Sequence, residues 1–255
     1  MAEFKSWHSY NDFERSTKRN CRYIYDKDIQ EFLEIVLETS KKRYRQIKKG
    51  SIFWRSQLGN DLKPVFHDNE YVFDDPYPLK PERMKPIPNM ANEGRANPKG
   101  IPYLYLATDK ETAMAESRPW LGAHISVGQF KVNQDIAVVD CSLFYNKNNY
   151  IFMDEPSAEE KEKSVWSYID SAFSEPVTGS DNIADYVPTQ ILAELFKCNG
   201  FDGLVYKSNL EKGHNIVLFN IERVDMVNCY LFKTDKIKFS FTESFEQYHL
   251  RKKNN

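Results

Sequence analysis

Residues 94–120 hold an arginine, a tyrosine and a glutamate that could act on one substrate. Tyr105 lies ten residues after Arg95, and Glu116 lies twenty-one residues after Arg95. A guanidinium can hold phosphate or ribose oxygens through two hydrogen bonds, and an aromatic face can stack on a cationic ring. A carboxylate can stabilise positive charge that develops on a sugar. Converging on one pocket, these groups suit a substrate with phosphates, a flat cationic ring and a ribose, as NAD has.

Each of these residues also has an ordinary structural explanation. Arg95 is either a ligand contact or a surface arginine in a loop, and Tyr105 is either a stacking platform or a core tyrosine. Glu116 follows small apolar residues on an expected helix, where burial without a partner is costly. It is therefore either a functional carboxylate in a cleft or the partner of Arg118 in a partly exposed ion pair. Ser208 either binds a ligand or satisfies its own backbone.

The elements that would position these residues follow from hydrophobic periodicity and capping signals. Asp28 and Glu31 predict the start of a helix that ends near Gly50, and Thr108 and Glu111 predict the start of a second one. Further helices are expected at 158–173 and 189–198. Strands are expected at 52–55, 103–107, 125–130 (partly an exposed edge), 136–140, 203–206, 215–220 and 236–241.

Strands outnumber clean strand–helix–strand repeats, so we expect an α+β fold with a curved, mixed and largely antiparallel sheet. Residues 1–50 read as an N-terminal helical extension and residues 51–255 as the catalytic domain. Prolines at 76, 78, 81, 86 and 88 exclude a regular helix or a central strand there. We therefore expect a long irregular loop insertion at 60–94, which is either a binding loop or lid or a plain surface insertion.

Composition narrows the function classes. The net charge of −2 gives no electrostatic case for nucleic acid or an anionic membrane. The basic runs at 41–49 and 251–253 read as a solvated helix end and a chain end. The four cysteines are far apart and form no CxxC pair, so we expect no metal site and reduced thiols. Neither a signal peptide nor a membrane span is evident, which predicts a cytoplasmic protein.

Further motifs accompany the arginine, tyrosine and glutamate. They are GRANPKG at 94–100, YLA at 105–107, ETAMAE at 111–116, YVPTQ at 186–190, GLVYKS at 203–208 and GHN at 213–215. Together they resemble the RES domain family, named for an invariant Arg, Glu and Ser, over residues 53–219. Residues 1–50 and the proline-rich insertion depart from the short toxins of that family, so an antitoxin contact surface is expected to differ.

The resemblance implies a fold related to ADP-ribosyltransferase toxins and an enzyme that cleaves NAD between nicotinamide and ribose. Water or inorganic phosphate would be the acceptor, and an antitoxin protein would restrain the enzyme. The alternatives are an ADP-ribosyltransferase that modifies a protein and a non-catalytic module that binds NAD. No cofactor and no metal are implied. The expected catalytic residues are Arg95, Tyr105, Glu116 and Ser208, and the expected substrate contacts are Arg55, Asn97, Gly100, Tyr186 and Asn215.

Overall fold

A large, mostly antiparallel sheet forms the centre of the molecule. The computed structural model describes residues 3–143, 154–175 and 183–241. The sheet has eight strands in the order β1-β7-β8-β9-β5-β2-β6-β10, and only β7 and β8 run parallel. Its strands are β1 (Tyr44–Ile47), β2 (Ile52–Leu58), β5 (Leu104–Ala107), β6 (His124–Val132), β7 (Ile136–Asp140), β8 (Gly203–Lys207), β9 (His214–Leu218) and β10 (Val224–Lys233). The expected α+β class with a largely antiparallel sheet is confirmed.

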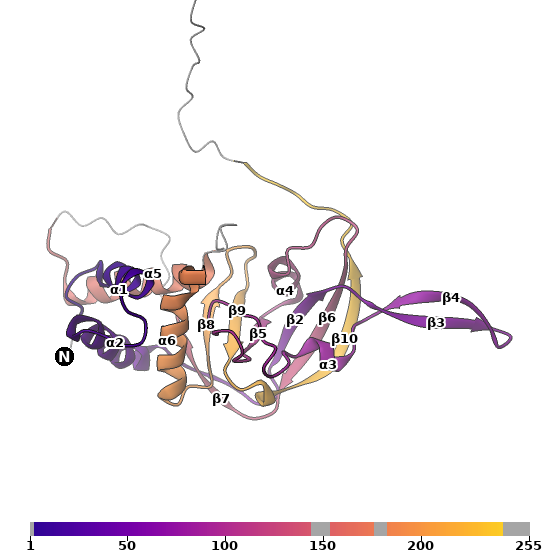
Figure 1. Ribbon diagram of the computed structural model, residues 1–255, viewed down its shortest axis with the longest axis horizontal. Helices are drawn as coiled ribbons and strands as arrows, with labels where there is room; N and C mark the ends of the chain where they lie inside the picture. Colours follow the sequence, from indigo (N-terminus) through magenta and orange to yellow (C-terminus); the bar gives the residue numbers. More distant parts are fainter. Residues whose placement is uncertain (1–2, 144–153, 176–182, 242–255) are drawn as a thin grey trace, which may run out of the picture.

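Four helices gather at the β7–β8 side of the sheet (Figure 1). They are α1 (Ser9–Arg19), α2 (Lys27–Ser40), α5 (Ala158–Ser174) and α6 (Val187–Cys198). A hydrophobic core joins them to one face of the sheet, with Phe13, Trp166 and Phe196 fully buried. The Trp166 indole N–H donates to Thr39 Oγ1 at 3.0 Å, which satisfies a polar atom inside this core. A second apolar cluster, with Phe130 and Leu218, covers the other face.

The N-terminal part differs from the expected single helix ending near Gly50. Helix α2 ends at Ser40, and the short 3₁₀ helix η1 (Lys41–Arg43) leads into β1, which pairs with β7. Part of the basic run is therefore a strand. The cap of α2 is Asp26, whose side chain accepts from the Ile29 amide at 2.9 Å, and Asp28 instead pairs with Lys5. The domain division near residue 50 stays a prediction.

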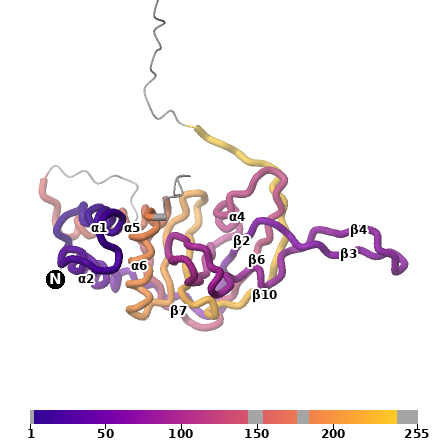
Figure 2. The backbone as a smooth tube through the Cα atoms, viewed as in Figure 1, coloured from indigo at the N-terminus to yellow at the C-terminus, as the bar shows by residue number. Residues whose placement is uncertain are grey.

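The proline-rich segment is more regular than expected. Strands β3 (Asp61–His67) and β4 (Glu70–Tyr77) form a separate two-stranded sheet, followed by the short helix α3 (Pro81–Met84). Prolines are tolerated in β3 and β4 because each strand pairs on one edge only. The hairpin stands away from the body in the ribbon and the tube (Figures 1 and 2).

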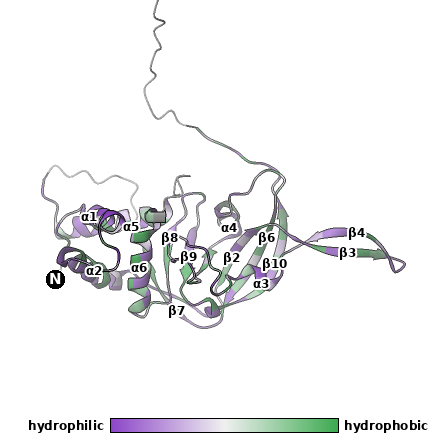
Figure 3. Ribbon diagram, viewed as in Figure 1, coloured by the Kyte–Doolittle hydropathy of each residue, from purple (hydrophilic) through white to green (hydrophobic). Residues whose placement is uncertain are grey.

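Three other strand predictions need correction or comment. Strand β6 is not an edge, because it lies between β2 and β10. Strand β10 was not predicted, and the expected strand at 236–241 is extended chain without strand pairing. Strands β8 and β9 each contain a short apolar run (Figure 3) and are buried along most of their length, which makes them easy to recognise. Within the described ranges, no helix has the length and apolar character needed to cross a membrane.

Candidate active site

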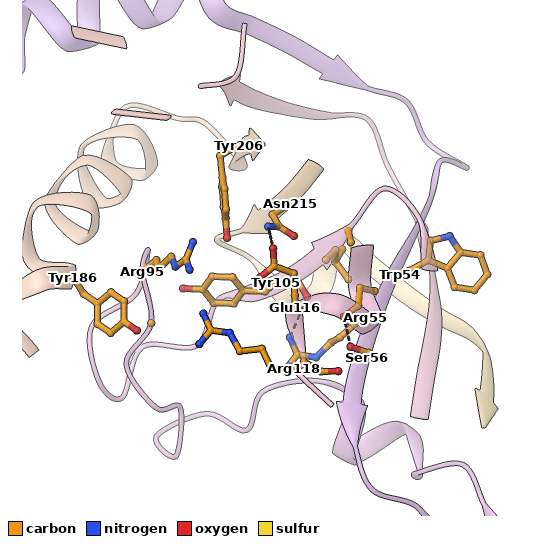
Figure 4. Close-up of a pocket in the computed structure, with 15 residues that line it drawn as sticks. Trp54, Arg55, Ser56, Arg95, Tyr105, Glu116, Arg118, Tyr186, Tyr206 and Asn215 are labelled. Atoms are coloured by element: carbon orange, nitrogen blue, oxygen red, sulfur yellow. Dashed lines mark hydrogen bonds between the residues drawn. The ribbon is translucent and has the colours of Figure 1, made fainter. Parts of the chain in front are cut away.

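A cavity of about 360 Å³ opens between β2, β5, α4 (Lys110–Glu116) and the ends of β8 and β9 (Figure 4). Arg95, Tyr105 and Glu116 all line it, so the three residues singled out by their spacing do meet. Arg55, Tyr186 and Asn215 of the expected substrate contacts line it as well. The remaining lining residues are Trp54, Ser56, Gly94, Leu106, Ala107, Ala113, Ser117, Arg118 and Tyr206.

Glu116 is the last residue of α4 and is held by two hydrogen bonds. Its Oε1 accepts from Ser208 Oγ at 2.8 Å and from Asn215 Nδ2 at 2.6 Å. Helix α4 is itself fixed at its start, where the Asp109 side chain caps the Thr112 amide at 2.8 Å, in place of the expected Thr108. The alternative ion pair with Arg118 is not formed among the described residues. Glu116 Oε2 has no hydrogen bond within the same residues, which leaves it available to a substrate.

Ser208 acts on Glu116 and does not itself line the cavity. Its side chain is 3% exposed, and its Oγ accepts from the amides of Leu210 and Glu211 at 3.1 and 3.3 Å. Because those two amides donate to Oγ, the hydroxyl proton is directed at Glu116. The structure thus places Ser208 in contact with Glu116 and outside the lining of the cavity, and its catalytic role stays a prediction.

Tyr105 is held at its hydroxyl so that its ring cannot turn. The hydroxyl donates to Asn97 Oδ1 at 2.7 Å and accepts from the Ala96 amide at 3.0 Å, and burial raises the pKa of Tyr105 to about 12. Gly94 permits this arrangement, because a Cβ there would lie 2.6 Å from the Tyr105 hydroxyl oxygen. Asn97 therefore holds the Tyr105 hydroxyl by a hydrogen bond and does not line this cavity.

Arg95 and Arg55 enter the cavity from different sides. Arg95 donates to the carbonyl of Phe173 in α5, which ties the loop after Gly94 to the helical layer. Arg55 lies on β2 and donates to the carbonyl of Tyr105 at 3.1 Å. Burial lowers the pKa of Arg55 to about 10, which still leaves its guanidinium charged at neutral pH.

The family comparison agrees with this geometry. A family model described as RES domain matches residues 72–241, which is more than half of the chain. The chain belongs to the RES domain family. A crystal structure of the M. tuberculosis MbcT–MbcA toxin–antitoxin complex is similar at 13% sequence identity and a TM-score of 0.38, over 78% of this chain and 92% of that chain. No curated protein matches the chain.

The cavity of this RES domain contains residues that sequence reasoning did not assign to it. Arg118 lines it with φ +47°, a left-handed conformation that is uncommon outside glycine. Its guanidinium has no ion pair or hydrogen bond among the described residues. Tyr206, on β8, is 4% exposed, and burial raises the pKa of its hydroxyl. Trp54 and Ser56 lie on β2 on either side of Arg55 in the sequence. Successive side chains of a strand point to opposite faces, so Arg55 alone gave no signal for these two residues.

Gly100, like Asn97, is an expected substrate contact that does not line the cavity of this RES domain. Gly100 has φ +88° and donates its amide to the carbonyl of Ala91, so it shapes a turn. In chemical terms, the cavity combines the cations Arg55, Arg95 and Arg118 with one oriented carboxylate and the three tyrosines Tyr105, Tyr186 and Tyr206. No group of three or more His, Cys, Asp or Glu side chains suited to a metal ion occurs in the part of the chain that the structure describes.

Proposed function

We propose that this protein consumes NAD by cleaving the bond between nicotinamide and ribose, with chemistry related to that of the ADP-ribosyltransferases. The observation that carries the proposal is the orientation of Glu116 by Ser208 and Asn215 at the wall of a cavity that also holds Arg95 and Tyr105. Membership of the RES domain family supports the same reading.

In the proposed reaction, the C–N bond breaks and its electron pair goes to the nicotinamide nitrogen. Nicotinamide leaves as a neutral molecule, so no strong general acid is needed. Positive charge develops on the ribose, and the free Oε2 of Glu116 either stabilises that charge or holds the ribose hydroxyls. Arg95 binds the pyrophosphate or the ribose, and the clamped ring of Tyr105 orients nicotinamide.

The acceptor then forms a new C–O bond with the ribose. Water gives ADP-ribose and releases one proton, whereas hydrogen phosphate gives ADP-ribose 1″-phosphate. A protein nucleophile would give an ADP-ribosylated protein. Neither a metal nor a resident cofactor takes part in any of these three routes. Within a cell, we propose that the enzyme acts as a toxin or stress effector in the cytoplasm, restrained by a cognate antitoxin.

The decisive experiment incubates the purified protein with NAD, with and without phosphate, and resolves the products by chromatography and mass spectrometry. Glu116→Gln is the key variant, because the amide keeps an oxygen for Ser208 and Asn215 but carries no charge. We expect its rate of nicotinamide release to fall at least about hundredfold. Glu111→Gln, on the same helix and outside the cavity, is the matched control and should keep the wild-type rate.

Each product pattern has a separate meaning. A rate that Glu116→Gln leaves unchanged would refute the assignment of Glu116. Nicotinamide release that requires a cell lysate, with label from NAD retained on protein, would identify an ADP-ribosyltransferase. Saturable binding of NAD without any product would identify a binding module.

A further inference from the structure

Two residues with a buried, unpartnered polar atom line a second cavity. In the described part of the chain, the buried side-chain atoms that lack a hydrogen bond are Arg55 Nε, Tyr103 Oη, Asp170 Oδ2, Arg223 Nε and Thr234 Oγ1. Buried polar groups are normally paired, so each exception needs an explanation. Two of these residues, Arg55 and Tyr103, line a cavity of about 400 Å³ next to the candidate active site.

The second cavity adjoins the first. Arg55 and Tyr105 line both of them, so these two side chains form the boundary between the two spaces. A ligand with two linked halves could therefore occupy both cavities while passing Arg55. NAD has this form, because a pyrophosphate joins its nicotinamide half to its adenosine half.

Charge in the second cavity favours phosphate groups. Arg55, Arg83 and Lys85 line it against a single acid, Glu82, so three positive charges less one negative charge leave +2. Arg83 has no ion pair among the described residues, and Lys85 Nζ forms one long ion pair, at 3.9 Å, with the 75% exposed carboxylate of Glu222. An exposed ion pair of this length is weak, so both cations can bind an anion.

The same cavity also offers an apolar surface for a flat ring. Ile87 and Met90 line it and are 51% and 74% exposed, so their apolar surface is accessible to a ring bound there. Asn92 and Gln57 add amide groups that can donate to or accept from a base or a ribose. Cations beside an apolar shelf suit a nucleotide better than a free inorganic anion.

The wall that carries Arg83 and Lys85 is anchored to the body. Met84, between them, is fully buried, and Leu79 is 4% exposed with its amide donating to Ser126 Oγ at 2.9 Å. The two cations therefore stand on a fixed segment, so little conformational entropy is lost when they bind an anion.

We propose that the second cavity binds the adenosine diphosphate half of NAD, with the pyrophosphate on Arg55, Arg83 and Lys85 and the adenine on Ile87 and Met90. This inference rests on the proposed function, since it locates the other half of the same substrate. It gives the proline-rich segment a role in substrate binding.

The test measures binding of ADP and of nicotinamide mononucleotide separately, by isothermal titration calorimetry on the full chain. In the double variant Arg83→Gln/Lys85→Gln, we expect the Kd for ADP to rise at least tenfold. The Kd for nicotinamide mononucleotide should change less than twofold, because that half lies in the first cavity. Lys48→Gln/Lys49→Gln removes the same two charges at a distant, exposed site and is the matched control.

The outcomes separate this inference from the proposed function. Loss of ADP affinity in the double variant would support the inference. If the wild type also failed to cleave NAD, that failure would refute only the proposed function. Cleavage of NAD with the same KM in the wild type and the double variant would keep the function and overturn the inference. Failure of the wild type to bind ADP, or equal ADP binding by the double variant and the wild type, would also overturn it.

Discussion

At the residue scale, the chemistry depends on how firmly one carboxylate is held. Glu116 Oε1 accepts hydrogen bonds from both Asn215 Nδ2 and Ser208 Oγ. A hydrogen bond to a charged group contributes about 1.5–3 kcal/mol of stabilisation. We predict that Asn215→Ala and Ser208→Ala each lower kcat for nicotinamide release by about ten- to a hundredfold. A change of this kind, with KM moving much less, is expected when the lost contact acts on the transition state.

The control for these variants is Asn133→Ala, which removes an asparagine that donates to the carbonyl of Glu222 far from the cavity. Its kcat should stay within twofold of the wild type. If Asn215→Ala and Ser208→Ala also keep the wild-type kcat and pH profile, then the orientation of Glu116 is not what limits the reaction.

Spacing and motifs were enough to predict Arg95, Tyr105 and Glu116 as one site, because strand β5 and helix α4 are short and regular and leave little freedom between them. Two other features of the site, the position of Arg118 and the direction of the Ser208 side chain, could not be predicted from the sequence. Arg118 enters the cavity through a left-handed backbone conformation, which is uncommon for a residue that is not glycine. Ser208 was found, but its direction depends on two amides of the following turn.

At the element scale, the proline-rich segment divides into two parts with different packing. The β3–β4 hairpin has exposed aromatic side chains, with Phe66 59% and Tyr77 52% exposed, whereas Met84 in α3 is fully buried. Because Asp61 and Tyr77 face each other in register, two glycines can replace residues 62–76. We predict that this deletion changes the free energy of unfolding by no more than about 1 kcal/mol, as measured by urea denaturation.

Met84→Ala, in the same segment, provides the contrast. It removes a fully buried side chain and should lower the free energy of unfolding by about 2–5 kcal/mol. A hairpin deletion that costs as much as Met84→Ala would mean that the hairpin packs on the body.

Helices and strands were predicted correctly where the hydrophobic periodicity of the sequence matches the pattern of buried side chains in the structure. The bounds of β7 (Ile136–Asp140) were predicted without error, and α5 and α6 were predicted to within two residues at each end. The hairpin was missed because proline argues against strands in general, although a lone two-stranded sheet tolerates it. Strand β10 was missed because, with four of its ten residues exposed and a bulge between Met226 and Asn228, it has no clean alternation.

At the scale of the whole molecule, the helical layer and the sheet meet at a buried acid. Asp170 of α5 is fully buried, and its Oδ1 accepts from the Lys207 amide of β8 at 3.2 Å, while its Oδ2 has no partner among the described residues. Burial raises the pKa of Asp170 to about 6, with the nearby Asp140 adding to the rise, and the Lys207 amide and the charges of Lys207 and Arg43 opposing it.

This raised pKa makes the stability of the fold depend on pH. Between the unfolded value of 3.8 and about 6, the folded state holds the proton more tightly than the unfolded chain, so the free energy of unfolding falls as the pH rises through that window. Asp170→Asn carries no proton to lose and keeps an oxygen for the Lys207 amide. We predict that the variant matches the wild type near pH 4 and is more stable by up to about 3 kcal/mol at pH 7.

Guanidinium denaturation at both pH values measures this difference, with Asp12→Asn, a mostly exposed acid on α1, as the control that should stay within about 0.5 kcal/mol. A variant that is less stable than the wild type at pH 7 would mean that the ionised carboxylate is held by Arg43 and Lys207 strongly enough to offset its burial. In that case Asp170 would be an ionic link between the helical layer and the sheet. With the predicted result, the acid at this junction instead costs stability at neutral pH, and the apolar core around Phe173 and Trp166 holds the two layers together.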